Sequence, residues 1–465
     1  MGAEGQVVRA MMPVTDSMFL IAETREHPMH VGGLQLFELP EGAGPDYLNG
    51  VYRRLVESTT VHEVFLRKPV RALTSLGQWS WRQEDDIDLE YHVRFSALPR
   101  PGRVRELLAL VSRLHGTLLD RHRPLWELHL IEGLEGNRYA IYTKVHHSVL
   151  DGVSALRWMQ RALSPDPEQA DMPGVFALPD RPRRPTQTRS RRGLGQQVKQ
   201  LVEDVAGVPG MLADAVTKGL SDPERKLPFQ APKTMLNGSI TGARRFAAQD
   251  WALDRIDQAR ELHGATLNDI VLAMSAGALR RYLLEMDALP EQGLVAAVPV
   301  SLRAKHGGAS QVDSGNSIGF TLCDLATEEA DPVIRMKRVQ QSMSAAKQGL
   351  SGRSPLQILT LSALTIAPLG LSPIPGFVDR TRPPFNVIIS NVPGPQETQY
   401  WNGARMQGVY PLSIVLDGQA LNITVTTYAG RLHFGLTGCR RNIPHLQRML
   451  TYLEDSLAEL EPEHG

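Results

Sequence analysis

The 465-residue sequence has few cysteines, no excess of either charge and no long apolar segment, and each absence excludes a class of protein. Only Cys323 and Cys439 are present, too few for a disulfide framework or a cysteine-based zinc site. Lysine plus arginine equals aspartate plus glutamate at 50 each, so charge gives no reason to expect nucleic acid as a partner. No apolar run reaches the roughly 18 residues of a membrane-spanning helix.

The first residues give no sign of export. Residues 1–13 lack the apolar run of a signal peptide, and Gln6 departs from the myristoylation pattern that Gly2 begins. Together with the scarcity of cysteine, this predicts a cytoplasmic protein. The hydrophobic fraction of 42% and the charged fraction of 22% are ordinary for a globular chain, and the length suits two or three domains.

A strand, a turn and a helix are predicted for residues 138–163. Residues 139–145 are β-branched, aromatic or alternating in polarity, which is typical of a strand. Apolar residues then recur at helical spacing, at Val153, Leu156, Met159 and Leu163. Residues 148–152 are therefore the predicted turn, and we expect Gly152 to relieve its steric limits.

Two adjacent histidines close the predicted strand. Strand side chains alternate between faces, so His147 is expected on the face of Val145 and His146 on the face of Lys144. A histidine followed four residues later by Asp151 suits general base catalysis, because an imidazole accepts a proton near neutral pH. We expect Asp151 to hold the loop through an arginine or backbone amides rather than to touch a substrate.

Other interpretations of these residues stay open. The plainest is a core histidine whose ring is satisfied by hydrogen bonds. A zinc site from His146, His147 and Asp151 is disfavoured because adjacent strand histidines diverge and no HExxH pattern is present. Ser148 as a nucleophile is disfavoured because the chain lacks GxSxG, and neither cysteine has the basic setting of a reactive thiol.

Composition divides the chain into three parts. Residues 1–163 form the first predicted domain and residues 242–465 the second, joined by a Pro- and Arg-rich linker and helical crossover at residues 164–241. In the linker, a basic cluster at residues 181–192 precedes an amphipathic stretch at residues 194–220. That stretch either lies on a lipid surface or packs across a domain interface.

Both domains are expected to mix strands and helices. Strands are predicted at residues 29–39, 86–93, 244–253, 294–303 and 385–395, and as a hairpin over residues 121–145. Helices are predicted to start at Thr15 with Asp16 and at Asp46, and to cover residues 104–118, 254–264, 266–286 and the C-terminal stretch. Thr266 and Asp269 have the spacing of a capping box.

Several motifs carry a family resemblance. HHSVLDG at residues 146–152 resembles the HHxxxDG motif of the CoA-dependent acyltransferase superfamily. The ordered set PLWELHLIEGL, TLNDIVL, PVSLR, GNSIG and NVPGP narrows this to the bacterial wax ester synthase/diacylglycerol acyltransferases, as do TDSMFL and MHVGGL near the N-terminus. One departure is Cys439, where members of that family often have an aspartate.

The resemblance implies a mixed α/β (α+β) fold. It implies two chloramphenicol-acetyltransferase-like domains, each a mixed β-sheet packed with helices, with a substrate tunnel at their interface. It implies that His147 is the catalytic base and belongs to a catalytic set completed by His146, Asp151 and Gly152. The remaining residues it implies shape the substrate site: Pro124, Leu125, Trp126, Asn268 and Asp269.

The sequence alone also allows purely structural roles for these substrate-site candidates. PLW is equally a hydrophobic turn packed on a sheet, and Asp269 is equally the capping-box acid of its own helix. Asn268 is the better functional candidate, because an amide at a helix N-terminus can donate toward developing negative charge. Arg303 is expected to anchor a loop or a phosphate.

The resemblance also implies the substrates. Acyl-CoA is the expected co-substrate, with no cofactor and no metal, and diacylglycerol or a fatty alcohol is the expected acceptor. Peripheral contact with membranes or lipid droplets follows from those lipids. Two alternatives are acyl transfer or condensation on a different acceptor, and a lipid-binding protein with an idle site. Acceptor preference, acyl length and oligomeric state are left open.

Overall fold

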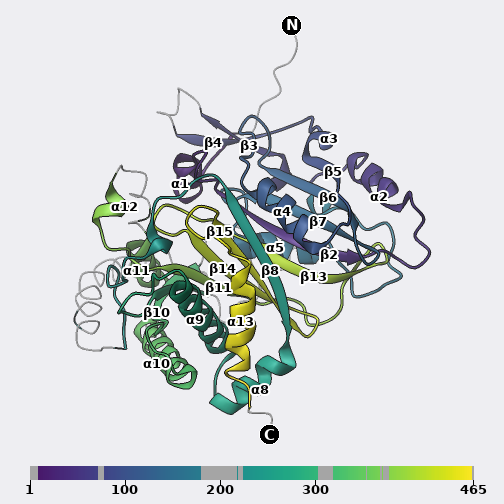
Figure 1. Ribbon diagram of the computed structural model, residues 1–465. Helices are drawn as coiled ribbons and strands as arrows, with labels where there is room; N and C mark the ends of the chain where they lie inside the picture. The colour runs from purple at the N-terminus through teal and green to yellow at the C-terminus, as the bar shows by residue number, and fades with distance from the viewer. Residues whose placement is uncertain are drawn as a thin grey trace, which may run out of the picture.

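The computed structural model describes residues 9–71, 78–179, 217, 224–301, 318–351, 353–366, 369 and 376–462. Figure 1 shows two lobes, with the N-terminal elements in the upper lobe and most C-terminal elements in the lower one. Each lobe is built on a six-stranded sheet. The predicted basic cluster, the amphipathic stretch apart from Thr217, and Arg303 lie outside the described residues.

The upper sheet contains the predicted histidine strand at its centre. Its order is β12-β13-β2-β7-β6-β5. Strand β7 (Arg138–His146) pairs antiparallel with β2 (His30–Glu38) and with β6 (Trp126–Leu134). The hairpin predicted from the sequence is therefore confirmed. The remaining strands are β5 (Val93–Ala97), β12 (Tyr400–Trp401) and β13 (Ala404–Leu412).

Helices cover both faces of this sheet. Ile141 and Val145 of β7 pack in one hydrophobic core with α5 (Gly152–Arg161) and α2 (Tyr47–Val56). Ala140 and Tyr142 pack in another core with α4 (Val104–His115). The predicted alternation of β7 between two faces is thus confirmed, and both faces are buried.

The N-terminal helix begins earlier than predicted. Helix α1 (Val14–Ala22) follows Pro13, and no side-chain hydrogen bond caps its start. Thr15 and Asp16 therefore lie inside the first turn rather than before it. There the acidic side chain of Asp16 is suited to the positive end of the helix dipole.

The prediction of an extended segment at residues 86–93 is wrong. Leu89–His92 form a short helix, α3, before β5 begins at Val93. The Asp88 carboxylate accepts a hydrogen bond from the Tyr91 backbone N–H at 3.1 Å, which caps the helix. The alternation of apolar residues in this segment favours a strand, but the Asp88 cap stabilises a short helix instead.

The lower sheet has the order β10-β9-β11-β14-β15-β8. Its strands are β8 (Arg244–Ala252), β9 (Val295–Ser301), β10 (Ile318–Asp324), β11 (Val387–Val392), β14 (Leu421–Tyr428) and β15 (Arg431–Cys439). The helices of this lobe are α8 (Leu253–His263), α9 (Leu267–Glu285), α10 (Pro332–Leu350), α11 (Pro355–Ile366), α12 (Phe377–Arg380) and α13 (Arg448–Ala458). The predicted capping box and the predicted stop of α8 at Gly264 are both confirmed.

Strand β13 joins the lobes, although it comes from the C-terminal part of the chain. It pairs antiparallel with β2 and continues the upper sheet. The Pro411 carbonyl of β13 also approaches Gly435 of β15 so closely that a Cβ atom at Gly435 would lie 2.0 Å from the oxygen. Glycine is therefore required where the two sheets cross. The domain boundaries drawn from composition stay predictions.

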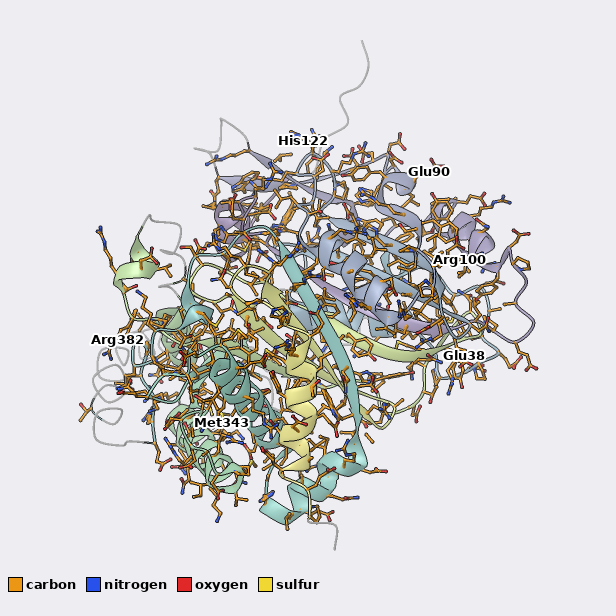
Figure 2. All side chains as sticks on the ribbon, in the orientation of Figure 1. Glu38, Glu90, Arg100, His122, Met343 and Arg382 are labelled. Atoms are coloured by element: carbon orange, nitrogen blue, oxygen red, sulfur yellow. The ribbon has the colours of Figure 1, made fainter. Side chains whose placement is uncertain are left out.

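Smaller pieces complete the upper lobe. A three-stranded sheet is formed by β1 (Arg9–Met11), β3 (Arg67–Arg71) and β4 (Trp79–Gln83). Residues 175–178, inside the predicted linker, pack into the core beneath α5. Figure 2 shows side chains filling both lobes, with Met343 among the helices of the lower lobe and Glu38 and Arg100 at the edge of the upper one.

Among the described residues, no helix is both long enough and apolar enough to cross a membrane.

Candidate active site

His147 is the first residue after β7, in the turn that leads to α5. Its backbone N–H donates to the Met29 carbonyl at 2.8 Å, which ties the turn to the residue before β2. The Phe19 ring of α1 stacks on its imidazole, with ring centroids 4.1 Å apart and planes 23° from parallel. The backbone hydrogen bond thus fixes the main chain of His147, and the Phe19 ring packs against its imidazole.

Burial sets the protonation state of His147. Desolvation lowers its pKa to about 4, although the negative charge of Asp151 acts to raise it. The ring is therefore neutral at pH 7, the state that accepts a proton. Its Nδ1 is buried without a well-aligned partner, and the residue's own carbonyl is near enough to raise the pKa. We assign the proton to Nδ1, which leaves the Nε2 lone pair for a substrate.

His146 lies in a different environment, on the opposite face. It is fully buried, and its Nδ1 accepts a hydrogen bond from the Ser148 backbone N–H at 3.1 Å. Because Nδ1 accepts, Nε2 carries the proton, and it points to Glu23 Oε1 at 3.4 Å. Both ring nitrogens face protein groups, so the geometry favours a supporting position for His146.

Ser148 is placed beside His146 rather than His147. Its Oγ lies 2.7 Å from His146 Nδ1, and the residue is 4% exposed. A serine nucleophile needs both a free base and access to the substrate. Here the base nitrogen is already shared with the Ser148 backbone N–H, so the geometry does not favour this role.

Asp151 and Gly152 form the start of α5. Asp151 Oδ1 accepts a hydrogen bond from the Ser154 backbone N–H at 2.7 Å, so the expected anchoring through a backbone amide is confirmed. The expected steric role of Gly152 is wrong: its φ is not positive, and an added Cβ would meet only Val31 Cγ1, at 3.8 Å. None of the described residues comes close enough to demand glycine there.

Comparison with known proteins decides the family. The model of the wax ester synthase/diacylglycerol acyltransferase catalytic domain matches residues 11–271, and that of the C-terminal domain matches residues 314–461. The chain belongs to the wax ester synthase/diacylglycerol acyltransferase family. A relative from Mycobacterium tuberculosis, named as a probable diacylglycerol O-acyltransferase, is 50% identical over 98% of this chain and 99% of its own length.

Solved structures agree with this assignment. The wax ester synthase/diacylglycerol acyltransferase from Marinobacter aquaeolei VT8 is 43% identical, with a TM-score of 0.78 over 97% of this chain and 98% of that one. The first condensation domain of the calcium-dependent antibiotic synthetase has a TM-score of 0.58 at 16% identity over 98% of each chain, which shows a common fold alone. The predicted family and the predicted two-domain fold are confirmed.

The family's PLW element packs beside the histidine turn. The Leu125 carbonyl accepts the His146 backbone N–H at 2.9 Å, and its side chain shares a core with Leu20 of α1. The Trp126 indole N–H donates to the Phe65 carbonyl at 2.8 Å. Pro124 is buried next to them. These contacts support the packing interpretation, and a role in shaping the acyl site stays a prediction.

Asn268 and Asp269 begin α9 in the lower lobe. Asp269 Oδ2 accepts from the Thr266 backbone N–H at 3.0 Å and from the Thr266 hydroxyl at 2.7 Å, which completes the capping box. No hydrogen bond or ring contact among the described residues joins either side chain to the histidine turn. Their contribution to the site stays a prediction.

Three residues that contact the histidine pair are not predicted from the sequence: Phe19, Glu23 and Met29. Glu23 is the most informative, because its side chain is 1% exposed although its neighbours Thr24, Arg25 and Glu26 are exposed. Burial acts to raise its pKa, but His146, the Met29 N–H and Arg121 together hold it below its ordinary value. The burial of Glu23 is explained by partners that are distant in sequence, such as Arg121 and His146. The periodicity of the sequence does not reveal these contacts.

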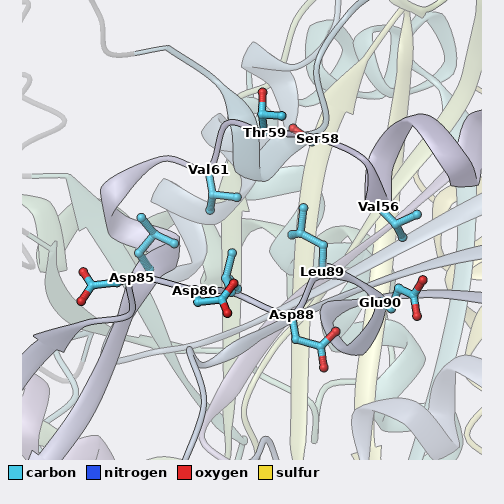
Figure 3. Close-up of a pocket in the computed structure, with 11 residues that line it drawn as sticks. Val56, Ser58, Thr59, Val61, Asp85, Asp86, Asp88, Leu89 and Glu90 are labelled. Carbon is cyan, nitrogen blue, oxygen red and sulfur yellow. The ribbon is translucent and has the colours of Figure 1, made fainter.

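Two pockets differ in what they can bind. A small apolar one lies between β2, β7 and α5, on the face of Thr143 and Val145. The larger one lies at α3, and Figure 3 shows Asp86, Asp88 and Glu90 around it. Its carboxylates would repel the phosphates of CoA. The described residues contain no group of three or more His, Cys, Asp or Glu side chains able to hold a metal ion.

Replacing Phe19 by Ala should raise the pKa of His147 from about 4 toward 6.5, because water would then stabilise the charged ring. The measurement is an NMR titration of 13C-histidine-labelled protein, with the His147 signal assigned by its absence in His147→Gln. His433 of the lower lobe also has a pKa lowered to about 4 and is the internal control. An unchanged His147 titration would show that Phe19 does not desolvate the ring.

Proposed function

We propose that this protein is an O-acyltransferase that moves a long-chain acyl group from acyl-CoA to diacylglycerol or a fatty alcohol. The products are triacylglycerol or a wax ester, with free CoA released. The observation that carries the proposal is the neutral, desolvated His147 at the end of β7 in a chain of this family. Acyl-CoA serves as co-substrate, and the chemistry needs no cofactor.

His147 acts as general base in this proposal. Its Nε2 takes the hydroxyl proton of the acceptor while the acceptor oxygen attacks the thioester carbonyl. The C–O bond forms, the C–S bond breaks, and the proton on His147 is available to the departing CoA thiolate. A base with a pKa near 4 suffices because the hydroxyl proton becomes acidic as the C–O bond forms. No acyl-enzyme is involved.

The surroundings of His147 suit an apolar acyl chain. The small pocket between β2, β7 and α5 is lined by Val31, Phe65, Val145, Trp158 and Met159 among others. Val145, which lines this pocket, lies two residues before His147, and the pocket has a volume of about 10 Å³, so side chains must move before it can take an acyl chain. Methionine is unbranched and adaptable, so Met159 can move to admit a chain. We propose this region as the seat of the acyl group.

An assay with three acceptors tests the reaction. Palmitoyl-CoA is offered with dipalmitoylglycerol, hexadecanol or spermidine, and CoA release and products are measured. We expect ester formation with one or both lipid alcohols. Activity confined to the amine would contradict the proposal and favour a different acyl transfer on this fold. Lipid binding without any turnover would instead favour a lipid-binding protein.

Replacing His147 by Ala should lower kcat by two or more orders of magnitude, in line with the roughly 100-fold to 10000-fold contribution of general bases. The control is His122→Ala, because that histidine is exposed at the surface of the upper lobe (Figure 2). Full activity of His147→Ala would move the base elsewhere, and His146→Ala would be measured next.

Lipid substrates also suggest contact with a lipid surface, which we propose as peripheral. Helix α1 carries Phe19 toward His147, while Met18 and Ile21 are 58% and 68% exposed. The basic cluster at residues 181–192 supplies charge for anionic lipids. Exposed apolar side chains beside the site, together with a basic segment elsewhere in the sequence, suit the interfacial zone of a bilayer.

Flotation with anionic liposomes tests this contact. A variant with the arginines of residues 181–192 replaced by serine and a Met18→Ser, Ile21→Ser variant should both float less than the parent. The reason is loss of electrostatic attraction in the first and of buried apolar area in the second. Undiminished flotation of both would exclude these segments as the lipid-binding surface.

A further inference from the structure

Glu23 ends α1 with a carboxylate that is almost completely buried. The residue is the C-cap of the helix, and its side chain is 1% exposed. A buried charge is costly unless hydrogen bonds and opposite charges compensate it. The reaction proposed above assigns this carboxylate no task. The groups that contact the Glu23 carboxylate therefore indicate what this buried charge does.

The two carboxylate oxygens have separate partners. Oε2 accepts from Arg121 Nε at 3.0 Å, and Arg121 also donates to the Leu20 carbonyl at 2.8 Å. Oε1 accepts from the Met29 backbone N–H at 3.1 Å and faces His146 Nε2 at 3.4 Å. One oxygen thus binds an arginine that anchors α1, and the other binds the Met29 backbone and lies at ion-pair distance from His146, on the two segments that meet at the histidine turn.

Three connections lead from Glu23 to His147. Met29 bonds Glu23 through its N–H and His147 through its carbonyl. His146, which faces Oε1, is the preceding residue in the chain. Phe19, one turn before Glu23 on α1, stacks on the His147 ring. The Met29 backbone and the His146 ring thus contact the Glu23 side chain directly, and the stacking Phe19 lies one turn away on the same helix.

We infer that Glu23 is a positioning residue, whose carboxylate fixes the His146 tautomer and the histidine turn so that His147 meets the acceptor hydroxyl in a productive geometry. The inference rests on the proposed function, since it supports the base named there. Glu23 touches no reacting atom, so it acts only through other residues. Displacement of a base by about 1 Å is enough to lose roughly 100-fold in rate.

Glu23→Gln is the informative change because it keeps the shape and removes the charge. If the amide oxygen stays toward Met29 and His146, the amide N–H groups face the Arg121 donors. If the amide flips, its N–H groups face the Met29 N–H and His146 Nε2–H donors. Either orientation sets a donor against a donor and displaces the turn.

The test compares two acceptors of different acidity. With hexadecanol, kcat of Glu23→Gln should fall about tenfold to a hundredfold, with KM for palmitoyl-CoA nearly unchanged. With 2,2-difluorohexadecanol the loss should shrink, because a more acidic hydroxyl depends less on a well-aimed base. A general loss of folding affects both acceptors equally. The matched control is Asp250→Asn, a partly buried carboxylate of β8 that binds Tyr410 and Arg431.

A second variant keeps the inference testable if Glu23→Gln does not fold. Glu23→Asp retains the negative charge near Arg121 but is one methylene shorter, so its reach to Met29 and His146 is reduced. It should show the same dependence on acceptor acidity. Equal losses with both alcohols, or the same losses in Asp250→Asn, would overturn the positioning role.

His147→Ala, assayed in parallel, separates failure of this inference from failure of the proposed function. An inactive His147→Ala beside a fully active Glu23→Gln would overturn only the role of Glu23. A fully active His147→Ala would overturn the base assignment itself. A defect in Glu23→Gln that shrinks with the acidic alcohol, beside an inactive His147→Ala, would support both.

Discussion

The antiparallel pairing of β2 with β7 is the constraint on which the candidate site depends. His30 lies opposite His146, and the ladder is continued by the bond from the His147 N–H to the Met29 carbonyl. This pairing fixes which face each histidine takes, because a slip of one residue would exchange them. At the end of this ladder, Phe19 of α1 stacks on His147, which lies more than a hundred residues later in the sequence.

Neighbouring histidines thereby acquire opposite properties from one strand. His146 Nδ1 accepts from the Ser148 backbone N–H and its Nε2 lies 3.4 Å from Glu23 Oε1, while His147 stacks on a phenyl ring and has its pKa lowered to about 4 by desolvation. A ring whose two nitrogens both face protein groups has little room for a substrate. His147 Nδ1 has no hydrogen-bond partner among the described residues, so the orientation of that ring depends on its neighbours. Under the proposed function, His146 helps to place His147.

Local signals made much of this predictable, and long-range contacts account for the rest. Period-two alternation separated His147 from His146, and spacing found the capping box at Thr266 because its partner lies three residues away. No sequence pattern pairs Tyr410 with Leu34, or brings Arg121 to Glu23. The prediction for Gly152 was wrong because it assumed that the backbone of the turn excludes a side chain at this position. In the structure there is room for one.

Burial at this site has a chemical consequence beyond tuning a pKa. A thioester beside an activated hydroxyl group is equally open to attack by water, so a transferase must exclude water where its base lies. Under the proposed function, the Phe19 ring stacked on His147 contributes to that exclusion, and Val145, which lines the small apolar pocket, lies two residues before His147 in the chain. The same desolvation weakens the base, and the charge of Asp151 partly offsets it. Under the proposed function, the low pKa suits a hydroxyl proton that becomes acidic as the ester bond forms, while exclusion of water favours transfer over hydrolysis.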